Sequence, residues 1–439
     1  AGKRDAIRMR EISNARLLAF EVLTEVEINA LYSNIVLPQW LGRSKLSQED
    51  RALATELVYG SLRMRGRHDS LIKKVSTREL EEIDPKVLIC LRLGVHQLTQ
   101  MRIPSHAAIF ETVELAKRVV GKSSGSFVNA ILRSIDGVTS EVTTGEPAKL
   151  ENLASEFSHP EWIISSYLDS LKSESEVMAL LDANNAAASP NLIAWPGLST
   201  VDELVAAGAR EIAGSTSGVT FNGNPGDIPA IRERRAGVQD LGSQIVVEKF
   251  LETFAEGLRW LDMCAGPGGK AAYLSAFINQ KSGEFIANEI SEHRAELVKQ
   301  VVRKHQVTNF DARSLPESLG DFDRILLDAP CTGIGALRRR PEVRWRRTTG
   351  DLKNLTQLQA ELLDAATHRL KLDGILAYVT CSSHQAETTF QMRSFLKRYP
   401  NYERVPVNDH RADTLGDLQL WTHRDHCDAM YLSMVRKVS

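Results

Sequence analysis

Two hydrophobic segments of the sequence end in residues that can do covalent chemistry. The segment ILLDAPCTGIG (325–335) is aliphatic up to Asp328 and carries Cys331 three residues later. The segment AYVTCSS (377–383) brings Cys381 to a similar place. A cysteine at a strand end is usually a small hydrophobic residue. Two of them at neighbouring strand ends, one preceded by an aspartate, instead favour nucleophilic catalysis by thiols.

A glycine-rich turn supplies a second chemical signal. The segment DMCAGPGGK (262–270) places glycines between a strand and a helix, where a backbone approaches a ligand closely and the helix N-terminus favours an anionic group. It is not a dinucleotide fingerprint, because Ala271 stands at the third glycine position, and it is not a P-loop. Glu289, at the end of the next strand, offers two acceptors for a ribose diol. We therefore expect a nucleoside cofactor without pyrophosphate, of which S-adenosylmethionine is the commonest.

Thiols, an acid and this cofactor together suit methyl transfer to carbon 5 of cytosine. That carbon is a poor nucleophile until a thiolate adds to carbon 6, and an acid near ring nitrogen 3 can stabilise the adduct. After transfer, the proton on carbon 5 and the thiol must both leave. Asp328, Cys331 and Cys381 supply suitable groups, and Lys270 is a cation that can raise the thiolate fraction. The spacing alone does not decide which thiol attacks.

Alternating strands and helices must position these groups. Such alternation gives a parallel sheet covered by helices on both faces, with ligands beyond the carboxyl ends of its strands. We expect the residues at those ends to face one crevice: Asp262, Cys264, Glu289, Asp328 and Cys381. The pattern predicts strands at 259–265, 283–289, 322–330 and 374–382, and helices at 269–279, 291–305 and around Leu355–Ala365.

The chain ahead of this region divides into three parts. Apolar residues at helical spacing, first over residues 11–26, predict an all-helical domain. Further on, a helix near 161–182 alternates with short strands at 191–195 and 218–222, which indicates a small α+β subdomain. The predicted boundaries are 1–136 for the helical domain, 137–150 for a linker, 151–235 for the subdomain and 236–439 for the catalytic domain.

Composition excludes several classes of protein. At 439 residues the chain is too long for one ordinary core, and no apolar run approaches the ~20 residues that cross a bilayer. Five scattered cysteines without a CxxC pair argue against a disulfide framework and against zinc. With a charged start unlike a signal sequence, we expect a cytoplasmic monomer with reduced thiols, no metal and no membrane partner.

A dense run of arginines follows Cys331. Residues 338–347 hold six arginines and one glutamate, whereas the net charge of the whole chain is −2. A charge run is more often a solvated loop, but its place beside the chemical groups leaves an RNA-binding segment equally open. The expected phosphate contacts are Arg338, Arg339, Arg340, Arg344 and Arg346, with Arg63, Arg65, Arg67, Lys73 and Lys74 as further basic residues.

Several motifs carry a family resemblance. DMCAGPGGK, DAPCTGIGALRRRPEVRW and YVTCS resemble the cofactor loop, the fourth motif and the sixth motif of the RNA cytosine-C5 methyltransferases. Near the front, NARLLAFEVLTEV and FVNAILRSI resemble the NusB-like RNA-binding domain of the bacterial branch, which modifies small-subunit ribosomal RNA. The resemblance covers nearly the whole chain. It implies a multidomain fold with an all-α NusB-like domain, a small α+β subdomain and an α/β Rossmann-like methyltransferase domain.

The resemblance also implies residue roles. In this family the cysteine at the position of Cys381 is the nucleophile, and the one at the position of Cys331 assists product release. Asp328 faces both ligands, and Lys270 joins the catalytic group. The implied product is 5-methylcytosine in 16S ribosomal RNA, made through a covalent cysteine–cytosine adduct. The implied cofactor residues are Cys264, Ala265, Gly266, Pro267, Gly268, Gly269, Lys270, Glu289, Arg294, Asp311 and Asp328.

Two segments depart from the family pattern. The acidic third motif is usually preceded by glycine, whereas this chain has Phe310 before Asp311. After the nucleophile the family often has a turn rich in proline, glutamate and asparagine, whereas this chain reads SSHQAETT, so we expect a different setting for Glu387.

The sequence leaves other functions open. A nicotinamide-dependent dehydrogenase would have no use for paired thiols, and tritium transfer from labelled S-adenosylmethionine separates the two activities. An RNA-binding or antitermination protein with an inactive methyltransferase fold is a non-catalytic alternative. The two thiols and the complete glycine-rich loop argue against it. Within the same chemistry, transfer RNA is an alternative substrate.

Overall fold

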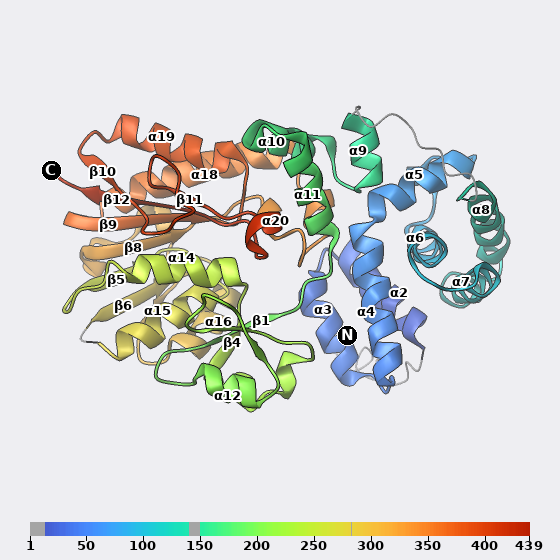
Figure 1. The fold of residues 1–439 in the computed structure, drawn as a ribbon, viewed down its shortest axis with the longest axis horizontal. Coiled ribbons are helices and arrows are strands. Elements are labelled where there is room, and N and C mark those ends of the chain that lie inside the picture. Colours follow the sequence, from blue (N-terminus) through green and yellow to red (C-terminus); the bar gives the residue numbers. More distant parts are fainter. Residues whose placement is uncertain (1–13, 140–149, 282) are drawn as a thin grey trace. The chain divides into compact units, whose positions relative to one another are not determined.

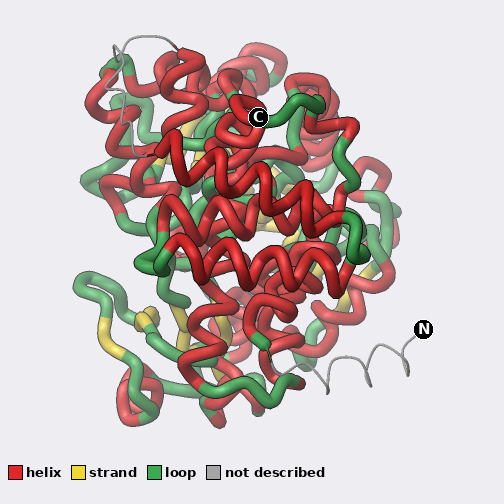
Figure 2. The backbone as a smooth tube through the Cα atoms, turned by 90° about the vertical axis from the view of Figure 1, so that its right-hand side faces the viewer, coloured by secondary structure: helices red, strands yellow, loops and turns green. Residues whose placement is uncertain are grey.

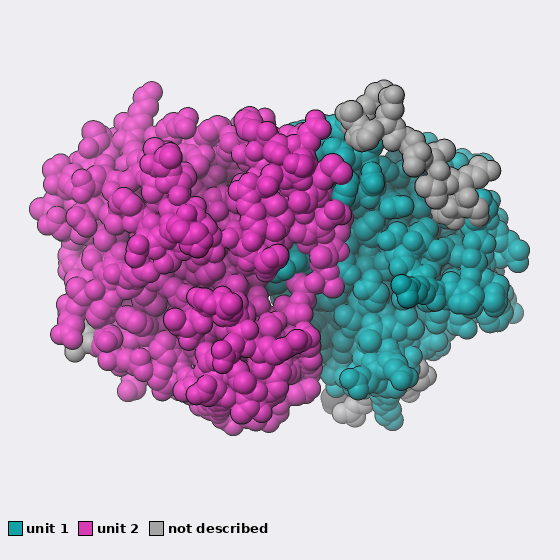
Figure 3. Space-filling view, viewed as in Figure 1, with its two compact units in different colours: residues 1–165, 337–346 teal, residues 166–336, 347–439 magenta. Residues whose placement is uncertain are grey.

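The structure, a computed structural model, describes residues 14–139, 150–281 and 283–439. It forms two compact units, one of residues up to 165 with 337–346, the other of residues 166–336 with 347–439 (Figure 3). Both predicted thiols, the glycine-rich turn and Glu289 belong to the second unit, so the candidate site can be described within that unit alone.

The first unit is built from helices, which predominate in the described backbone (Figure 2). Side chains at the predicted helical spacing, among them Ala19, Val22 and Val26, are buried in one apolar core. The first described helix starts where Asn14 caps it by accepting hydrogen bonds from the amides of Arg16 and Leu17. The helices are α2 (Ala15–Glu27), α3 (Ser33–Arg43), α4 (Gln48–Arg63), α5 (Arg65–Val75), α6 (Pro85–Gln100), α7 (Ser105–Val119), α8 (Ser124–Thr139) and α9 (Leu150–Glu156).

The boundaries of the units differ from the predicted domains. Helix α8 continues through residues 137–139, and most of the predicted linker, 140–149, lies outside the described residues. Residues 337–346, including the short helix α17 (Val343–Arg346), belong to the helical unit although they lie within the catalytic part of the sequence. The sequence did not indicate this return, because it depends on contacts between residues that are far apart in the chain.

A small antiparallel sheet opens the second unit. Its strand order is β2-β3-β1-β4, with β1 (Asn191–Ala194), β2 (Arg210–Glu211), β3 (Gly218–Thr220) and β4 (Ala236–Val238). The helix predicted near 161–182 is two helices, α10 (Glu161–Leu171) and α11 (Glu174–Asn185). Lys172 breaks the run with a positive φ of 54°, and Ser173 caps α11.

The large sheet has strand order β10-β12-β9-β8-β5-β6-β7, with β11 paired to β12. Strands β5 (Arg259–Asp262), β6 (Glu284–Asn288), β7 (Gln306–Thr308), β8 (Phe322–Asp328) and β9 (Leu370–Thr380) are parallel. The parallel sheet expected from the sequence is therefore present, and antiparallel strands extend it at one side. Strands β10 (Tyr402–Val405), β11 (Leu418–Gln419) and β12 (Tyr431–Lys437) pair antiparallel there.

Helices cover both faces of this sheet, as predicted (Figure 1). Helices α14 (Leu241–Leu251), α15 (Gly269–Asn279) and α16 (Glu292–Val302) lie on one face, and α18 (Thr349–Thr367) and α19 (Thr389–Arg398) lie on the other. The chain runs from β5 outward to β7 and then returns to β8 on the other side of β5. Ligands of open α/β sheets bind at such a reversal, beyond the carboxyl ends of the strands.

Candidate active site

The predicted chemical residues lie at the reversal between β5 and β8. Asp262 ends β5, Glu289 follows β6 and Asp328 ends β8, while Cys381 follows β9. The strands are parallel and in register, since Asp262 is opposite Leu326, and Asp328 is opposite Val379. The structure therefore brings these residues to one edge of the sheet, as the strand pattern predicted.

The glycine-rich turn is fixed by Glu289. The amide of Gly266 donates to Oε2 of Glu289 over 2.9 Å, and the amide of Ser291 donates to Oε1 over 2.9 Å. A β-carbon on Gly266 would lie 2.2 Å from that Oε2 atom, so this position requires glycine. Arg294 donates to the carbonyl of Gly266 and forms an ion pair with Glu289. The turn and the acidic residue thus form one cradle, which leads through Gly268, at φ 116°, into α15.

Lys270 and Asp328 form an ion pair beside the thiols. Nζ of Lys270 lies 2.7 Å from Oδ2 of Asp328. Burial alone would lower the pKa of the Lys270 ammonium, but the Asp328 carboxylate outweighs it and raises that pKa, with a smaller contribution from Cys381. Lys270 is therefore a permanent cation at neutral pH that faces both Asp328 and Cys381.

Asp262 is the residue of this edge with the most perturbed carboxyl group. It is fully buried, and neither of its carboxylate oxygens makes a well-formed hydrogen bond to another described side chain. Burial, reinforced by the charge of Asp328 and opposed by Lys270, raises the pKa of Asp262 to about 8. A buried carboxyl group of this kind beside a glycine cradle suits a ligand that carries positive charge, such as the sulfonium and ammonium groups of S-adenosylmethionine. The residues present therefore fit the predicted cofactor.

The two thiol-bearing loops touch each other. The amide of Gly335 donates to the carbonyl of Cys381 over 3.1 Å, and the backbone of Cys381 is hydrogen-bonded to the Cys331 sulfur. A β-carbon on Gly335 would lie 2.9 Å from the Cys381 carbonyl, so only glycine allows this approach. Burial, reinforced by Glu387 and Asp328, raises the pKa of the Cys331 thiol to about 12. Cys331 is therefore a neutral thiol at physiological pH.

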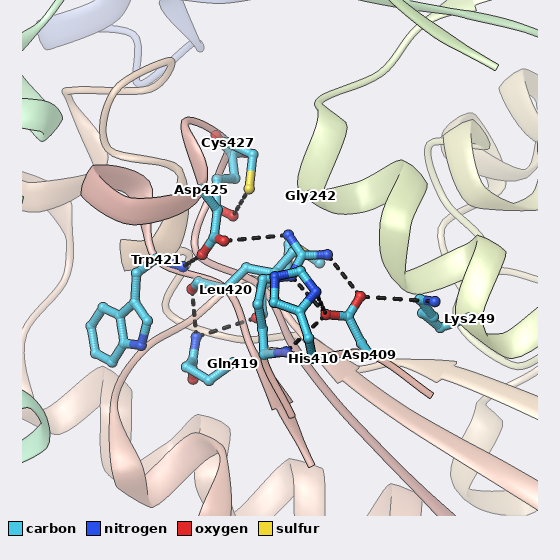
Figure 4. Close-up of polar contacts among 12 residues, drawn as sticks. Gly242, Lys249, Asp409, His410, Gln419, Leu420, Trp421, Asp425 and Cys427 are labelled. Carbon is cyan, nitrogen blue, oxygen red and sulfur yellow. Dashed lines mark hydrogen bonds and ion pairs between the residues drawn. The ribbon is translucent and has the colours of Figure 1, made fainter. Parts of the chain in front are cut away.

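A network of polar contacts around Asp409 and Asp425 joins the segments that precede strands β11 and β12 (Figure 4). Arg411 forms ion pairs with Asp409 and Asp425, and Oδ2 of Asp425 accepts from the amide of Trp421. The chain that follows brings Ala429 against the first loop, where its amide donates to the carbonyl of Gly335 over 2.8 Å. The antiparallel strands thus support the loop that carries Cys331.

Asp311 lies near the carboxyl end of β7, as expected for an adenine contact, but its carboxylate is already paired. Arg313 donates to it from its backbone amide and its side chain, at 2.7–3.2 Å, and thereby lowers its pKa. An adenine would have to share this carboxylate with Arg313, so the contact stays a prediction.

Two arginines of the predicted RNA-binding segment, residues 338–347, bind the protein's own backbone. Arg344 is fully buried, and its guanidinium donates to the carbonyls of Arg63 and Ser158. Arg346 donates to the carbonyls of Val26, Ala30 and Leu31. These two arginines hold the segment inside the helical unit, so the prediction that they contact phosphate is wrong for Arg344 and lacks support for Arg346.

The remaining basic residues stay candidates for phosphate contacts. The partly exposed arginines of the segment are Arg338, Arg339 and Arg340. Of the basic residues expected near the front, Arg63 is buried and paired with Glu56. Arg65 is partly buried over the ring of Trp345. The exposed residues of that group are Arg67, Lys73 and Lys74.

The residue that ties the thiol loops together, Glu387, has no sequence signal that marks this role. Glu387 is fully buried and accepts hydrogen bonds from Thr332, Ser382 and Gln359. A glutamate six residues after Cys381 was visible in the sequence, but its burial was not. The described residues hold no group of histidine, cysteine or acidic side chains arranged to bind a metal, and none of their helices is long and apolar enough to span a membrane.

The sequence and the fold are both similar to those of known proteins. The family model described as 16S rRNA methyltransferase RsmB/F matches residues 250–436, and that of the NusB family matches residues 13–136. A putative methyltransferase of Mycobacterium tuberculosis is 38% identical over 98% of both chains. The ribosomal RNA small subunit methyltransferase B of an Enterobacter species is 32% identical, over 88% of this chain and 91% of its own.

Solved structures share the fold. The protein PH0851 matches 98% of this chain and 100% of its own with a TM-score of 0.83 at 22% identity. NSun6 from Pyrococcus horikoshii, solved with the S-adenosylmethionine analogue SFG, matches 64% of this chain and 98% of its own with a TM-score of 0.58 at 16% identity. The chain therefore belongs to the RsmB/F family of S-adenosylmethionine-dependent 16S rRNA methyltransferases, with an N-terminal NusB domain.

Proposed function

We propose that this protein, acting in the cytoplasm, methylates carbon 5 of a cytosine in small-subunit ribosomal RNA through a covalent adduct with Cys381. The observation that carries the proposal is the arrangement at the sheet edge, where two thiol loops touch each other next to the Lys270–Asp328 ion pair. Few reactions other than activation of a pyrimidine ring need a nucleophilic thiol, a second thiol and a carboxyl group together.

The two thiols take different roles in this proposal. Cys381 lies on the side of Lys270, whose positive charge favours a thiolate nearby. Cys331 is a neutral thiol because burial and two carboxylates oppose its ionisation. The environment therefore supports the assignment, implied by the family resemblance, of Cys381 as the nucleophile and Cys331 as the residue that assists release.

The reaction would proceed in three steps. The Cys381 thiolate forms a bond to carbon 6 of cytosine as the double bond between carbons 5 and 6 opens, and the negative charge that develops at ring nitrogen 3 is neutralised by a proton delivered from the Lys270–Asp328 pair. Carbon 5, now enamine-like, takes the methyl group, for which S-adenosylmethionine supplies the electrophile. The proton on carbon 5 then passes to a base in the cleft, its electron pair restores the double bond between carbons 5 and 6, and the carbon–sulfur bond breaks with the help of Cys331.

The cofactor would be held by the cradle of the glycine-rich turn. Glu289 is placed to accept the ribose hydroxyls, and Arg294 orders the turn from behind. The other residues predicted to contact the cofactor are residues 264–270, Asp311 and Asp328. A cytosine base must leave its stack to reach this site. The exposed basic residues Arg67, Lys73 and Lys74 of the helical unit would hold phosphates of the RNA, and such contacts make binding fall steeply with salt.

The test is methyl transfer to ribosomal RNA by the purified protein. With S-adenosylmethionine labelled in the methyl group, the label should appear in 5-methylcytosine after nuclease digestion of the RNA. Bisulfite sequencing of small-subunit ribosomal RNA from a deletion strain should show one cytosine that loses its methyl group. Label in another nucleoside, or in transfer RNA alone, would contradict the proposal.

A further inference from the structure

The buried carboxylate of Glu387 connects the two thiol loops. It accepts hydrogen bonds from the amide of Thr332 at 2.8 Å and from the Thr332 hydroxyl on one side, and from the hydroxyl of Ser382 at 2.6 Å on the other. Thr332 follows Cys331 directly, and Ser382 follows Cys381 directly. One side chain thus holds the residue next to each thiol.

The surroundings of Glu387 extend this link to the strands. Nε2 of Gln359 donates to Oε1 of Glu387 over 3.1 Å and also to the carbonyl of Pro330 over 2.9 Å. The Tyr378 hydroxyl donates to the backbone carbonyl of Glu387 over 2.8 Å. The carboxylate accepts four hydrogen bonds in all, and these fix its position beside the Cys331 turn.

A second buried glutamate shows what the same hydrogen-bond pattern does without thiols. Glu342, in the helical unit, accepts from the amide and the hydroxyl of Ser33, each at 2.9 Å. It is as inaccessible as Glu387, at 3% exposure against 0%. No described cysteine takes part in its interactions, so its role is to hold α3 to the segment 337–346. Any effect of Glu387 on thiol chemistry should be missing at Glu342.

The charged and titratable groups that act on Cys331 come from several elements of the second unit. Glu387 and Asp328 act on it with negative charge, and backbone amides at Gly333 and Cys381 donate toward its sulfur. Tyr378, a neutral phenol at physiological pH, lies on β9 within reach of both Cys331 and Glu387. The cation of this region, Lys270, is paired with Asp328. Glu387 faces Cys331 without an ion-pair partner among the interactions that the structure describes for it, and its charge also reaches His384, whose pKa is lowered by burial.

We propose that Glu387 is a positioning residue that ties the Cys331 turn to the Cys381 loop and gives the two thiols their different reactivities. This inference rests on the proposed function, because it matters only if one thiol must attack and the other must not. Two neighbouring thiolates would repel each other and compete for the same ring carbon. The negative charge of Glu387 acts on Cys331, whereas the positive charge of Lys270 acts on Cys381, and this difference removes that competition.

The test measures how each cysteine reacts with iodoacetamide as the pH is varied. Carbamidomethylation of the full-length protein is followed by mass spectrometry of peptides, which gives a separate rate profile for Cys331 and for Cys90 of the helical unit. Glu387→Gln keeps the shape of the side chain and removes its charge, and the hydroxyls of Thr332 and Ser382 can turn to accept from the new amide. We expect the midpoint of the Cys331 profile to move to lower pH by about one unit or more, with Cys90 unchanged.

Glu342→Gln is the matched control. It removes an equally buried charge that has the same kind of partners, and it should lower thermal stability as Glu387→Gln does while leaving the Cys331 profile where it is. A Cys331 midpoint that does not move in folded Glu387→Gln, or that moves equally in Glu342→Gln, would overturn the inference.

The wild-type protein gives an outcome that needs no variant. Cys331 should react only at strongly alkaline pH, and a midpoint at or below the ordinary thiol value of about 8.5 would refute the inference even if Glu387→Gln fails to fold. These measurements use neither RNA nor cofactor, so their result is independent of whether cytosine is the substrate. If alkylation behaves as expected but no methylcytosine forms, the proposed function fails and the thiol arrangement stands.

Discussion

The loop after β8 and the loop after β9 carry the same reactive group in opposite electrostatic settings. Cys331 faces the carboxylates of Glu387 and Asp328, which with burial raise its pKa to about 12. Cys381 faces the ammonium of Lys270. The two loops also touch through Gly335, so they are neighbours in one site and not two sites. Equal residue types at equivalent strand ends can therefore have different chemistry, which is decided by the charges that other elements bring to them.

The largest expected effect comes from the thiol on the cationic side. Cys381→Ala removes the nucleophile, so turnover should fall by about a thousandfold or more, since loss of a covalent nucleophile leaves only binding and orientation. The measurement is tritium transfer to ribosomal RNA at saturating cofactor. Cofactor affinity should stay near wild type, because the cradle at Gly266 does not involve Cys381. Activity close to wild type would contradict the difference drawn between the loops.

The thiol on the anionic side should give a smaller loss of turnover. Cys331→Ser leaves addition and methyl transfer intact but impairs release, so turnover should fall about a hundredfold, which is typical for loss of one proton-transfer group. A burst of one methyl transfer per enzyme should precede the slow steady state. A variant with no burst, or with undiminished turnover, would assign Cys331 another role.

Loss of the Lys270 cation should reduce the rate less than loss of Cys381. Lys270→Met removes the positive charge on the Cys381 side, which should lower the rate about tenfold to a hundredfold at pH 7 and less at higher pH, because hydroxide then makes the thiolate without help. The pH–rate profile of single turnover measures this. A uniform loss at every pH would indicate that Lys270 only positions Asp328.

The smallest expected effect is on stability. The pKa of Asp262 is about 8 in the folded protein and about 3.9 when unfolded, so between these values the folded state keeps a proton that the unfolded state has lost. The contribution of Asp262 to the free energy of unfolding is complete below pH 4. It is lost as the pH rises to 8, by at most about 1.4 kcal/mol per pH unit.

Asp262→Asn lacks this titration. Relative to wild type, its melting temperature should therefore rise as the pH is raised from 5.5 to 7.5. If the melting temperatures of the variant and of wild type change equally with pH over that range, in the absence of cofactor, Asp262 is not the titrating group.

Much of the catalytic unit was predictable because its strands are short hydrophobic runs that end in chemical residues. Strands β5, β6, β8 and β9 and helix α15 lie where the sequence places them. Strand β7 was missed because three residues, Gln306–Thr308, are too short for a periodic signal. The antiparallel strand β12 was missed because its side chains, buried on both faces over most of its length, give no alternation.

The arginine segment shows why other parts could not be predicted. Its charge suggested phosphate, but Arg344 donates to carbonyls of residues that are 186 and 281 positions away. Glu387 illustrates the same limit, because its partner Thr332 is 55 positions earlier. Local pattern locates residue types at strand ends, whereas the charge environment of a buried side chain depends on contacts distant in sequence.

The central claim, that Cys381 attacks while Cys331 does not, is tested most directly by the covalent complex itself. Cys331→Ser, incubated with ribosomal RNA and S-adenosylmethionine, should form an SDS-resistant RNA–protein adduct. After nuclease and protease digestion, mass spectrometry should find a methylated cytidine nucleotide on the peptide that contains Cys381. A nucleotide on any other cysteine peptide, or no adduct from a folded and cofactor-binding variant, would contradict the account.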